Sequence, residues 1–164
     1  MKKYIYLCLF LSALLTGCKQ NDWIDWKVMN ELWLEQNKKA DAVQTTSTGL
    51  QYKVLSEGNR TDTRPIPGGY VLVDYTLQLI NGRVIEVNTN TRFHCISSVT
   101  YSDGVIAGFA EGLQKMHKHA DYVFYIPWDL AYGEDGNSVS EGYTGAIPPY
   151  STLIFTVHLT DVSN

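Results

Sequence analysis

The last third of the chain contains three short apolar and aromatic blocks whose glycines and prolines strongly constrain the fold. The first block reads Val105-Ile106-Ala107-Gly108-Phe109, and the second reads Tyr125-Ile126-Pro127-Trp128-Asp129-Leu130-Ala131-Tyr132-Gly133. The third runs from Ala146-Ile147-Pro148-Pro149 to Phe155. Glycine and proline interrupt regular elements, so the blocks predict short elements joined by tight connections. No obvious nucleophile, general base or metal cluster lies within them, which indicates an aromatic-walled pocket that works by shape and desolvation.

Alternating apolar and polar residues predict strands along much of the remaining chain. These strands cover residues 49–55, 70–80, 83–87, 120–126 and 152–162. Asn81-Gly82 is a strong hairpin-turn signal, and residues 108–116 are predicted to form a short helix. Residues 88–104 are predicted to be irregular apart from a short strand around 93–96, and residues 127–146 to form a long loop. Many short strands with one helix favour an α+β fold with an antiparallel sheet.

Residues 1–17 have the pattern of a lipoprotein signal peptide. Two lysines follow Met1, and the apolar segment 4–15 is short for a membrane span. The segment ends in Leu15-Thr16-Gly17-Cys18, which resembles the bacterial lipobox. That resemblance implies cleavage before Cys18, acylation of this cysteine and stable anchoring through several acyl chains. It places the protein in the cell envelope, on the outer membrane facing the periplasm or the surface. The alternative is an ordinary secretory signal that happens to end in cysteine.

Residues 18–48 are predicted to comprise the lipidated cysteine, a short tether, an amphipathic helix over 23–39 and a linker over 40–48. Trp26, Met29 and Trp33 recur at helical spacing along one stripe of that helix. Packing of this stripe onto the chain's own domain is the favoured interpretation. A homodimer through the N-terminal helix and contact with the membrane surface are the alternatives.

Charge and cysteine content exclude several functions. The net charge of −4 over 164 residues leaves no basic stripe for nucleic acid. Cys8 lies in the leader and Cys18 would carry lipid, so Cys95 has no partner for a disulfide and is predicted to be a buried small hydrophobe. His117-Lys118-His119 lacks a third ligand nearby and is interpreted as a solvated turn rather than a metal site. We therefore expect no metal and no cofactor.

The three blocks match the phrases V-I-x-G-(W/F)-x-E-G-L, I-P-x-x-L-A-Y-G and I-P-P-x-(S/A)-T-L-x-F. In these phrases the chain closely resembles the FKBP-type peptidyl-prolyl isomerases. The resemblance implies a strongly curved antiparallel sheet wrapped around one short helix, with the pocket between them. It assigns residues 49–164 to the isomerase domain, preceded by the N-terminal helical extension.

The resemblance also assigns site residues position by position. In the family, the backbone N–H at the position of Ile106 binds a substrate carbonyl, and the hydroxyl at the position of Tyr132 points at the substrate. The catalytic set is Tyr75, Glu86, Ile106 and Tyr132. The substrate-binding set is Ile85, Phe93, Val105, Phe109, Tyr143 and Phe155.

The activity implied by the resemblance is rotation about the peptide bond that precedes proline, in proline-containing proteins exported to the envelope. This reaction needs no covalent intermediate, so the missing nucleophile does not argue against an enzyme. The chain departs from the family pattern at Ile85, where an aromatic is usual, at Glu86, where Asp is usual, and at Phe109, where Trp is commoner. These departures motivate two alternatives: a non-catalytic chaperone or binding module with the same fold, and a structural lipoprotein of an envelope machine.

Overall fold

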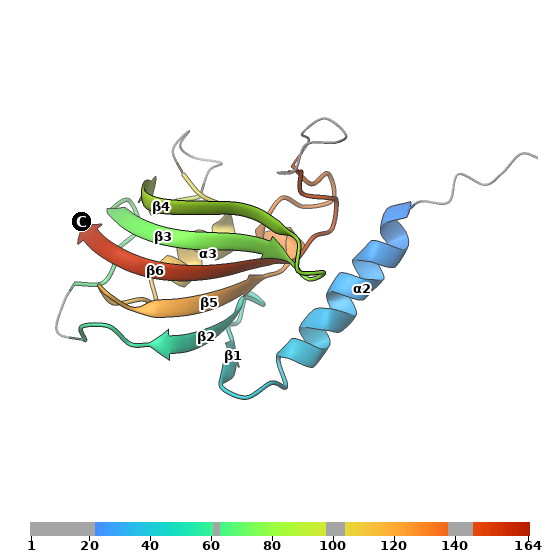
Figure 1. The fold of residues 1–164 in the computed structure, drawn as a ribbon, viewed down its shortest axis with the longest axis horizontal. Helices are drawn as coiled ribbons and strands as arrows, with labels where there is room; N and C mark the ends of the chain where they lie inside the picture. The colour runs from blue at the N-terminus through green and yellow to red at the C-terminus, as the bar shows by residue number, and fades with distance from the viewer. Residues whose placement is uncertain (1–21, 61–62, 98–103, 138–145) are drawn as a thin grey trace, which may run out of the picture.

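Six strands form one antiparallel sheet in the computed structural model, which describes residues 22–60, 63–97, 104–137 and 146–164 (Figure 1). The strands are β1 (Val43–Thr45), β2 (Gln51–Ser56), β3 (Tyr70–Leu79), β4 (Val84–His94), β5 (Asp121–Ile126) and β6 (Leu153–Ser163). They lie side by side in the order β1-β2-β5-β6-β3-β4. The helices of the described residues are α2 (Asp22–Asn37), α3 (Ala107–Leu113) and the one-turn 3-10 helix η2 (Trp128–Leu130). The predicted α+β fold, a curved sheet with one short helix and an N-terminal helix, is confirmed.

The central strand β3 shows why the sheet has two different faces. Every second residue from Val71 to Leu79 is buried, and the residues between them are partly exposed. Successive side chains of a strand point to opposite faces, so this alternation directs one face toward the core. β6 pairs with β3 along its whole length and with β5 on its other side. The three central strands thus present a continuous apolar surface to α3.

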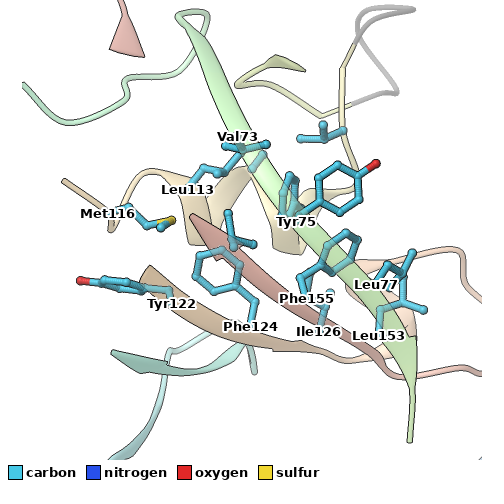
Figure 2. Packing of buried hydrophobic residues seen from close by; sticks show 14 of the residues in the cluster. Val73, Tyr75, Leu77, Leu113, Met116, Tyr122, Phe124, Ile126, Leu153 and Phe155 are labelled. Atoms are coloured by element: carbon cyan, nitrogen blue, oxygen red, sulfur yellow. The ribbon is translucent and has the colours of Figure 1, made fainter. Parts of the chain in front are cut away.

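The core lies between this surface and α3. Phe109 and Leu113 of α3 are buried against Phe124 of β5 and Phe155 of β6. Figure 2 shows side chains from β3, β5, β6 and α3 converging in this space. Cys95 is fully buried in the same cluster, and burial raises the pKa of its thiol to about 11. The prediction that Cys95 is a buried small hydrophobe is therefore confirmed.

Two glycines allow α3 to lie close to the sheet. A Cβ atom added at Gly112 would lie 2.8 Å from the Phe124 ring, and one added at Gly108 would overlap Ile126. Alanine would raise helix propensity by about 1 kcal/mol, but these contacts leave no room for its methyl group. Gly108 and Gly112 thus set the depth at which Phe109 enters the core.

The edge strand β4 is longer than predicted. Its sequence loses alternation after residue 87, yet it pairs with β3 as far as the Tyr70–His94 pair. A bulge explains the irregular pattern, because Thr91 pairs with Val73 while Asn88 pairs with Tyr75. Asn90 has a positive φ of 56° and donates its N–H to the Asp74 carboxylate at 2.6 Å. The polar residues predicted as irregular therefore form a bulged edge strand.

The predicted linker 40–48 also contains regular structure, since β1 pairs with β2 there. The helix α2 ends at Asn37, two residues before the predicted end. Its docked face matches the predicted stripe in part, because Trp26 and Trp33 pack onto the domain whereas Met29 is 51% exposed. Asn30 and Leu34, outside that stripe, are buried. α2 does pack onto its own domain, and Trp33 lies 5.6 Å from the ring of Tyr125. No helix in the described part of the chain is both long and apolar enough to span a membrane.

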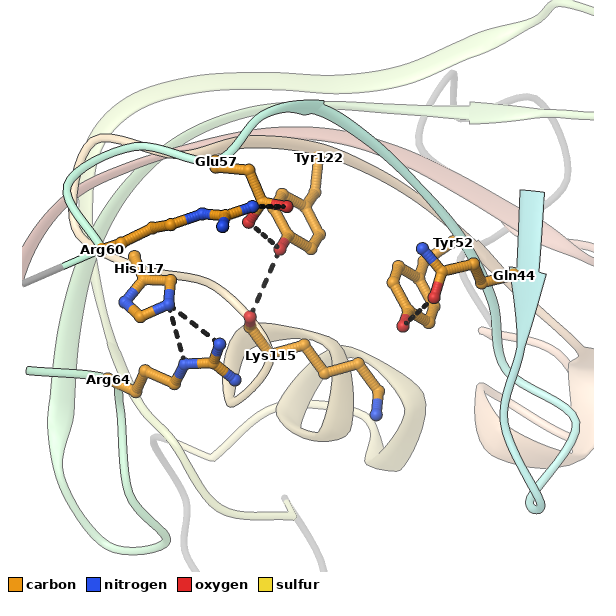
Figure 3. Close-up of polar contacts among 8 residues, drawn as sticks. All are labelled: Gln44, Tyr52, Glu57, Arg60, Arg64, Lys115, His117 and Tyr122. Atoms are coloured by element: carbon orange, nitrogen blue, oxygen red, sulfur yellow. Dashed lines mark hydrogen bonds and ion pairs between the residues drawn. The ribbon is translucent and has the colours of Figure 1, made fainter. Parts of the chain in front are cut away.

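Polar contacts fix the connection between β2 and β3 against the end of α3 (Figure 3). The Tyr122 hydroxyl donates toward the Glu57 carboxylate at 3.5 Å and toward the Lys115 carbonyl at 3.4 Å. Arg64 donates from its guanidinium to the Nε2 atom of His117 at 3.0 and 2.8 Å. His117 is only 8% exposed, so the interpretation of its segment as a solvated turn was wrong for this residue.

Candidate active site

A cavity of about 300 Å³ opens between α3 and the concave face of the sheet. β3 contributes Tyr75 and Leu77 to its wall, and the segment before α3 contributes Val105 and Ile106. Among the described residues, the lining consists of Tyr75, Leu77, Glu86, Phe93, Gly104, Val105, Ile106, Phe109, Tyr132 and Phe155. Glu86 is the one acidic or basic side chain among these residues, so the cavity is largely apolar with hydroxyls and one carboxylate on its wall.

Four aromatic rings form the deep part of the cavity. Phe109 lies 4.5 Å from Phe155, 5.8 Å from Phe93 and 6.1 Å from Tyr75, measured between ring centroids. The Phe93 and Phe109 rings meet nearly edge to face, at 85°. Such tilted and edge-to-face pairs are the favourable arrangements for aromatic side chains. The rings therefore hold one another in place and exclude water from the floor of the cavity.

A small polar network occupies one wall, where Tyr75 faces the returning strand β4. Asn88 donates one amide N–H to the Tyr75 hydroxyl oxygen at 2.9 Å and another to the Glu86 carboxylate. Burial, together with nearby Glu86, raises the pKa of Tyr75 to about 12, although the Asn88 hydrogen bond opposes this rise. The Tyr75 hydroxyl is therefore neutral at physiological pH and available as a hydrogen-bond donor.

Tyr132 lies at the rim, 40% exposed, in the turn that follows η2. Burial of part of the side chain and the negative charge of Glu86 raise its pKa, so this hydroxyl is also neutral. On the opposite side, the Val105 N–H donates to the Ile96 carbonyl at 2.9 Å and holds the segment that leads into α3. Ile106 directly precedes α3, and N–H groups at this position have no partner within a helix.

The structure brings together eight of the ten predicted site residues around this cavity. Ile85 does not line it and packs against the core instead. Tyr143 lies outside the described residues. Sequence reasoning missed Leu77, Gly104 and Asn88. Asn88 pairs with Tyr75 across the two strands. A correct prediction of the register between β3 and β4 would have placed the two residues opposite each other.

The described residues contain no group of three or more histidine, cysteine, aspartate or glutamate side chains able to hold a metal ion. Tyr75, Tyr132 and Glu86 nevertheless converge on one small space with two neutral hydroxyls and a carboxylate. The two hydroxyls can donate hydrogen bonds to a bound carbonyl. As nucleophiles for covalent catalysis, the neutral hydroxyls and the carboxylate are weak. The cavity is suited to binding an apolar residue and changing the environment of an adjacent peptide bond.

Two models of known protein families match this sequence. Residues 61–160 match the family model described as FKBP-type peptidyl-prolyl cis-trans isomerase. The chain belongs to this family. Residues 19–54 match a second model, the domain amino terminal to FKBP-type peptidyl-prolyl isomerase, so α2 and the first strands also have counterparts in the family. The three sequence phrases thus identified the family correctly.

Several characterised relatives share this organisation. The chain is 35% identical to the FKBP-type 22 kDa peptidyl-prolyl cis-trans isomerase of Escherichia coli K12 over 79% of its length and 58% of the relative. It is 36% identical to FkpA of the same strain, over 87% of its length and 48% of FkpA. It is 34% identical to the outer membrane protein MIP of Legionella longbeachae, over 83% of its length and 54% of MIP. The chain therefore spans only about half the length of these relatives.

Solved structures give the same result. The crystal structure of FkpA from Escherichia coli matches with a TM-score of 0.75 and 29% identity, covering 99% of this chain and 70% of FkpA. A peptidyl-prolyl cis-trans isomerase from Pseudomonas syringae matches with a TM-score of 0.72 and 26% identity, covering 87% of this chain and 96% of that one. The whole described fold, α2 included, is therefore an FKBP arrangement.

The raised pKa of Tyr75 predicts a specific loss of stability in alkali. The hydroxyl ionises near pH 10 in the unfolded chain but only near pH 12 in the folded one, so stability is fully present below pH 10 and falls as the pH rises toward 12. This residue accounts for about 2–3 kcal/mol of that fall. We expect Tyr75→Phe to reduce the pH dependence of the free energy of unfolding, measured by urea denaturation between about pH 9 and pH 11.5.

A suitable control is Leu77→Ala, which removes buried volume from the same strand without removing a titrating group. This variant should be less stable at every pH but should keep the wild-type slope. An unchanged slope in Tyr75→Phe would show that the Tyr75 hydroxyl ionises in the folded protein as easily as in the unfolded chain.

Proposed function

We propose that this protein is a peptidyl-prolyl cis-trans isomerase that assists the folding of exported proteins in the bacterial cell envelope. The observation that carries the proposal is the aromatic-walled cavity lined by eight of the predicted site residues, in a chain that belongs to the FKBP family. The cavity volume of about 300 Å³ is close to the lower limit for ligand pockets and suits a proline ring with its neighbouring residue.

Differential binding explains how such a cavity can accelerate the reaction. Resonance gives a planar peptide bond a rotational barrier of about 18–20 kcal/mol and places partial negative charge on its oxygen. Twisting the bond removes resonance and lowers that charge. An apolar cavity therefore disfavours the planar ground state more than the twisted transition state. A thousandfold acceleration requires only about 4 kcal/mol, which desolvation and one or two placed hydrogen bonds can supply.

Each wall of the cavity would have a distinct task. Phe93, Phe109 and Phe155 would hold the proline ring and exclude water. The Ile106 N–H would donate to a substrate carbonyl and fix the substrate's orientation. The neutral hydroxyls of Tyr75 and Tyr132 would donate to carbonyl oxygens of the substrate, a role supported by the raised pKa of both groups.

Glu86 would act through the polar network on this wall. Its carboxylate accepts a hydrogen bond from Asn88, whose amide also reaches the Tyr75 hydroxyl. The carboxylate would thereby orient Tyr75 rather than touch the substrate. Asn88 links the two groups, which would offset the different reach of a glutamate at a position where the family usually has aspartate.

The isomerase proposal can be tested with peptides that contain Leu-Pro or Phe-Pro. We expect micromolar wild-type protein to accelerate cis–trans exchange, which takes roughly tens to hundreds of seconds without catalyst. Tyr132→Phe should lower kcat/KM about tenfold, because it removes one hydrogen-bond donor from the rim and leaves the ring in place. Two-dimensional exchange NMR measures both rates directly.

Tyr52→Phe is the matched control, since the Tyr52 hydroxyl bonds to Gln44 outside the cavity. It should keep the wild-type rate. If the wild-type protein does not change the exchange rate at all, the isomerase proposal fails. Binding of the peptides without acceleration would instead identify a binding module.

We also propose that residues 1–17 are a lipoprotein signal peptide and that Cys18 carries the lipid anchor. The lipobox-like sequence before Cys18 supports this proposal, and the amino-terminal family model begins at residue 19, directly after it. We expect Cys18→Ser to move the protein from the membrane fraction to the soluble fraction when both forms are expressed in a bacterium. Identical partitioning of the two forms would contradict the proposal, whereas Cys95→Ser should remain with the membrane.

A homodimer through α2 is the third part of the proposal. Its support is an unburied apolar stripe at helical spacing, in which Ile24 is 56%, Val28 47% and Leu32 57% exposed. This stripe lies on α2 while other residues of the helix dock onto the domain. We expect sedimentation equilibrium to give a dimer mass for the wild type and a monomer mass for Val28→Glu. Val87→Glu makes the same substitution at an exposed valine of β4 and should remain dimeric, and a monomeric wild type would exclude the dimer.

A further inference from the structure

The docked face of α2 contacts two segments that flank the rim residue Tyr132. The first segment is η2, which ends two residues before Tyr132. The second is residues 148–152, which lead directly into β6 and its cavity residue Phe155. Figure 1 shows α2 beside the end of the sheet where β6 begins. The helix therefore contacts segments next to the cavity, but none of its residues is among the described residues that line the cavity.

Hydrogen bonds join α2 to residues 148–152. Asn30 is fully buried, and its Oδ1 atom accepts the Thr152 N–H at 2.7 Å while its Nδ2 atom donates to the Trp26 carbonyl at 2.8 Å. The Trp26 indole N–H donates to Ser151 Oγ at 3.0 Å, and that hydroxyl donates to the Pro148 carbonyl at 2.7 Å. These bonds fix the backbone that enters β6 to one position along α2.

Lys27 joins α2 to both flanking segments at once. Its ammonium lies 5.0 Å from the ring centroid of Trp128 in η2 and 4.7 Å from that of Tyr150. The two rings themselves meet edge to face, 5.3 Å apart at 82°. A cation over aromatic faces is attracted by their negative charge density. Lys27 therefore draws η2 and residues 148–152 together.

Tyr150 has a left-handed backbone, with φ at 57°, which is uncommon for a residue with a bulky side chain. Such strained residues persist where the surroundings over-determine them, and they concentrate at functional sites. Here the surroundings are Lys27 and Trp128 on the side chain and the Gly133 carbonyl, which accepts the Tyr150 N–H at 3.0 Å. Of these contacts, the one with Lys27 comes from α2.

Trp128 and Tyr150 are both hydrogen-bonded to the residue that follows Tyr132. This residue, Gly133, donates its N–H to the Trp128 carbonyl at 2.8 Å and accepts from Tyr150. The residue next to Tyr132 is therefore bonded to both residues that Lys27 covers. A shift of α2 would release Trp128 and Tyr150 together and change the direction in which the Tyr132 hydroxyl points.

We propose that α2 is a positioning element of the cavity, in which Lys27 and Asn30 hold the Tyr132 hydroxyl in its catalytic orientation. This inference rests on the proposed isomerase function. It assigns to the N-terminal helix a part in turnover that is separate from anchoring or dimerisation. Lys27 and Asn30 would be positioning residues, because neither lies among the residues that line the cavity.

A mutant cycle on the full-length protein tests this role. We expect Lys27→Met to lower kcat/KM about threefold and Asn30→Leu about tenfold, with Lys27→Arg close to wild type because it keeps the cation over the rings. Lys39→Met removes the same charge from an exposed side chain just after α2 and should have wild-type kinetics. In a Tyr132→Phe background, Lys27→Met should cause no further loss, because the hydroxyl it positions is gone.

Two results would overturn the positioning role. One is wild-type kinetics in both Lys27→Met and Asn30→Leu. The other is an equal loss from Lys27→Met with and without the Tyr132 hydroxyl, which is the behaviour of a purely structural contact. Urea denaturation identifies any Asn30→Leu protein that is unfolded, and the partly exposed Lys27 then decides the outcome. A wild type without turnover would instead refute the isomerase function itself.

Discussion

The cavity depends on the close packing of one short helix against the curved sheet. α3 has only seven residues, too few for a helix to be stable alone in water, so tertiary contacts must hold it. Gly108 and Gly112 bring its backbone against Ile126 and Phe124, and this depth places Phe109 between Phe155 and Phe93. Any larger residue at these glycines would lift the helix and separate the rings. The cavity thus results from the packing of α3 on the curved sheet and does not depend on any single reactive group.

This construction explains the chemistry available to the site. Rings that are fixed by one another keep the floor dry, while hydroxyls reach its wall from β3 and from the turn after η2. Burial raises the pKa of Tyr75 and Tyr132, so both remain donors rather than charges. A donor to the oxygen of the rotating peptide bond would favour the planar form, because the planar bond carries more negative charge on that oxygen. Exclusion of water therefore supplies the preference for the twisted form, and the donors orient the substrate through its other carbonyls.

The sequence predicted the central elements because their signals are local. Alternation defined β3, β5 and β6, and glycine and proline marked the three blocks that supply Phe109, Tyr132 and Phe155. The edge strand β4 could not be predicted in full, because its bulge breaks the alternation at polar residues that pair with β3. Asn88 was missed for the same reason, since its role depends on lying opposite Tyr75. The docked face of α2 was predicted only in part, with Trp26 and Trp33 but not Asn30 and Leu34, because apolar residues occur around the whole helix and only the tertiary structure selects which residues are buried.

Asn30 shows why a polar residue can be the better choice at such a contact. A helix with apolar residues on all sides could slide or rotate on an apolar surface at little cost, since those contacts are not directional. The buried amide satisfies both of its groups only when Thr152 and the Trp26 carbonyl are in place. Every other register would bury an unpaired donor or acceptor, which is costly. One side chain therefore fixes the helix at a single position beside the segment that enters β6, and leaves Ile24, Val28 and Leu32 exposed.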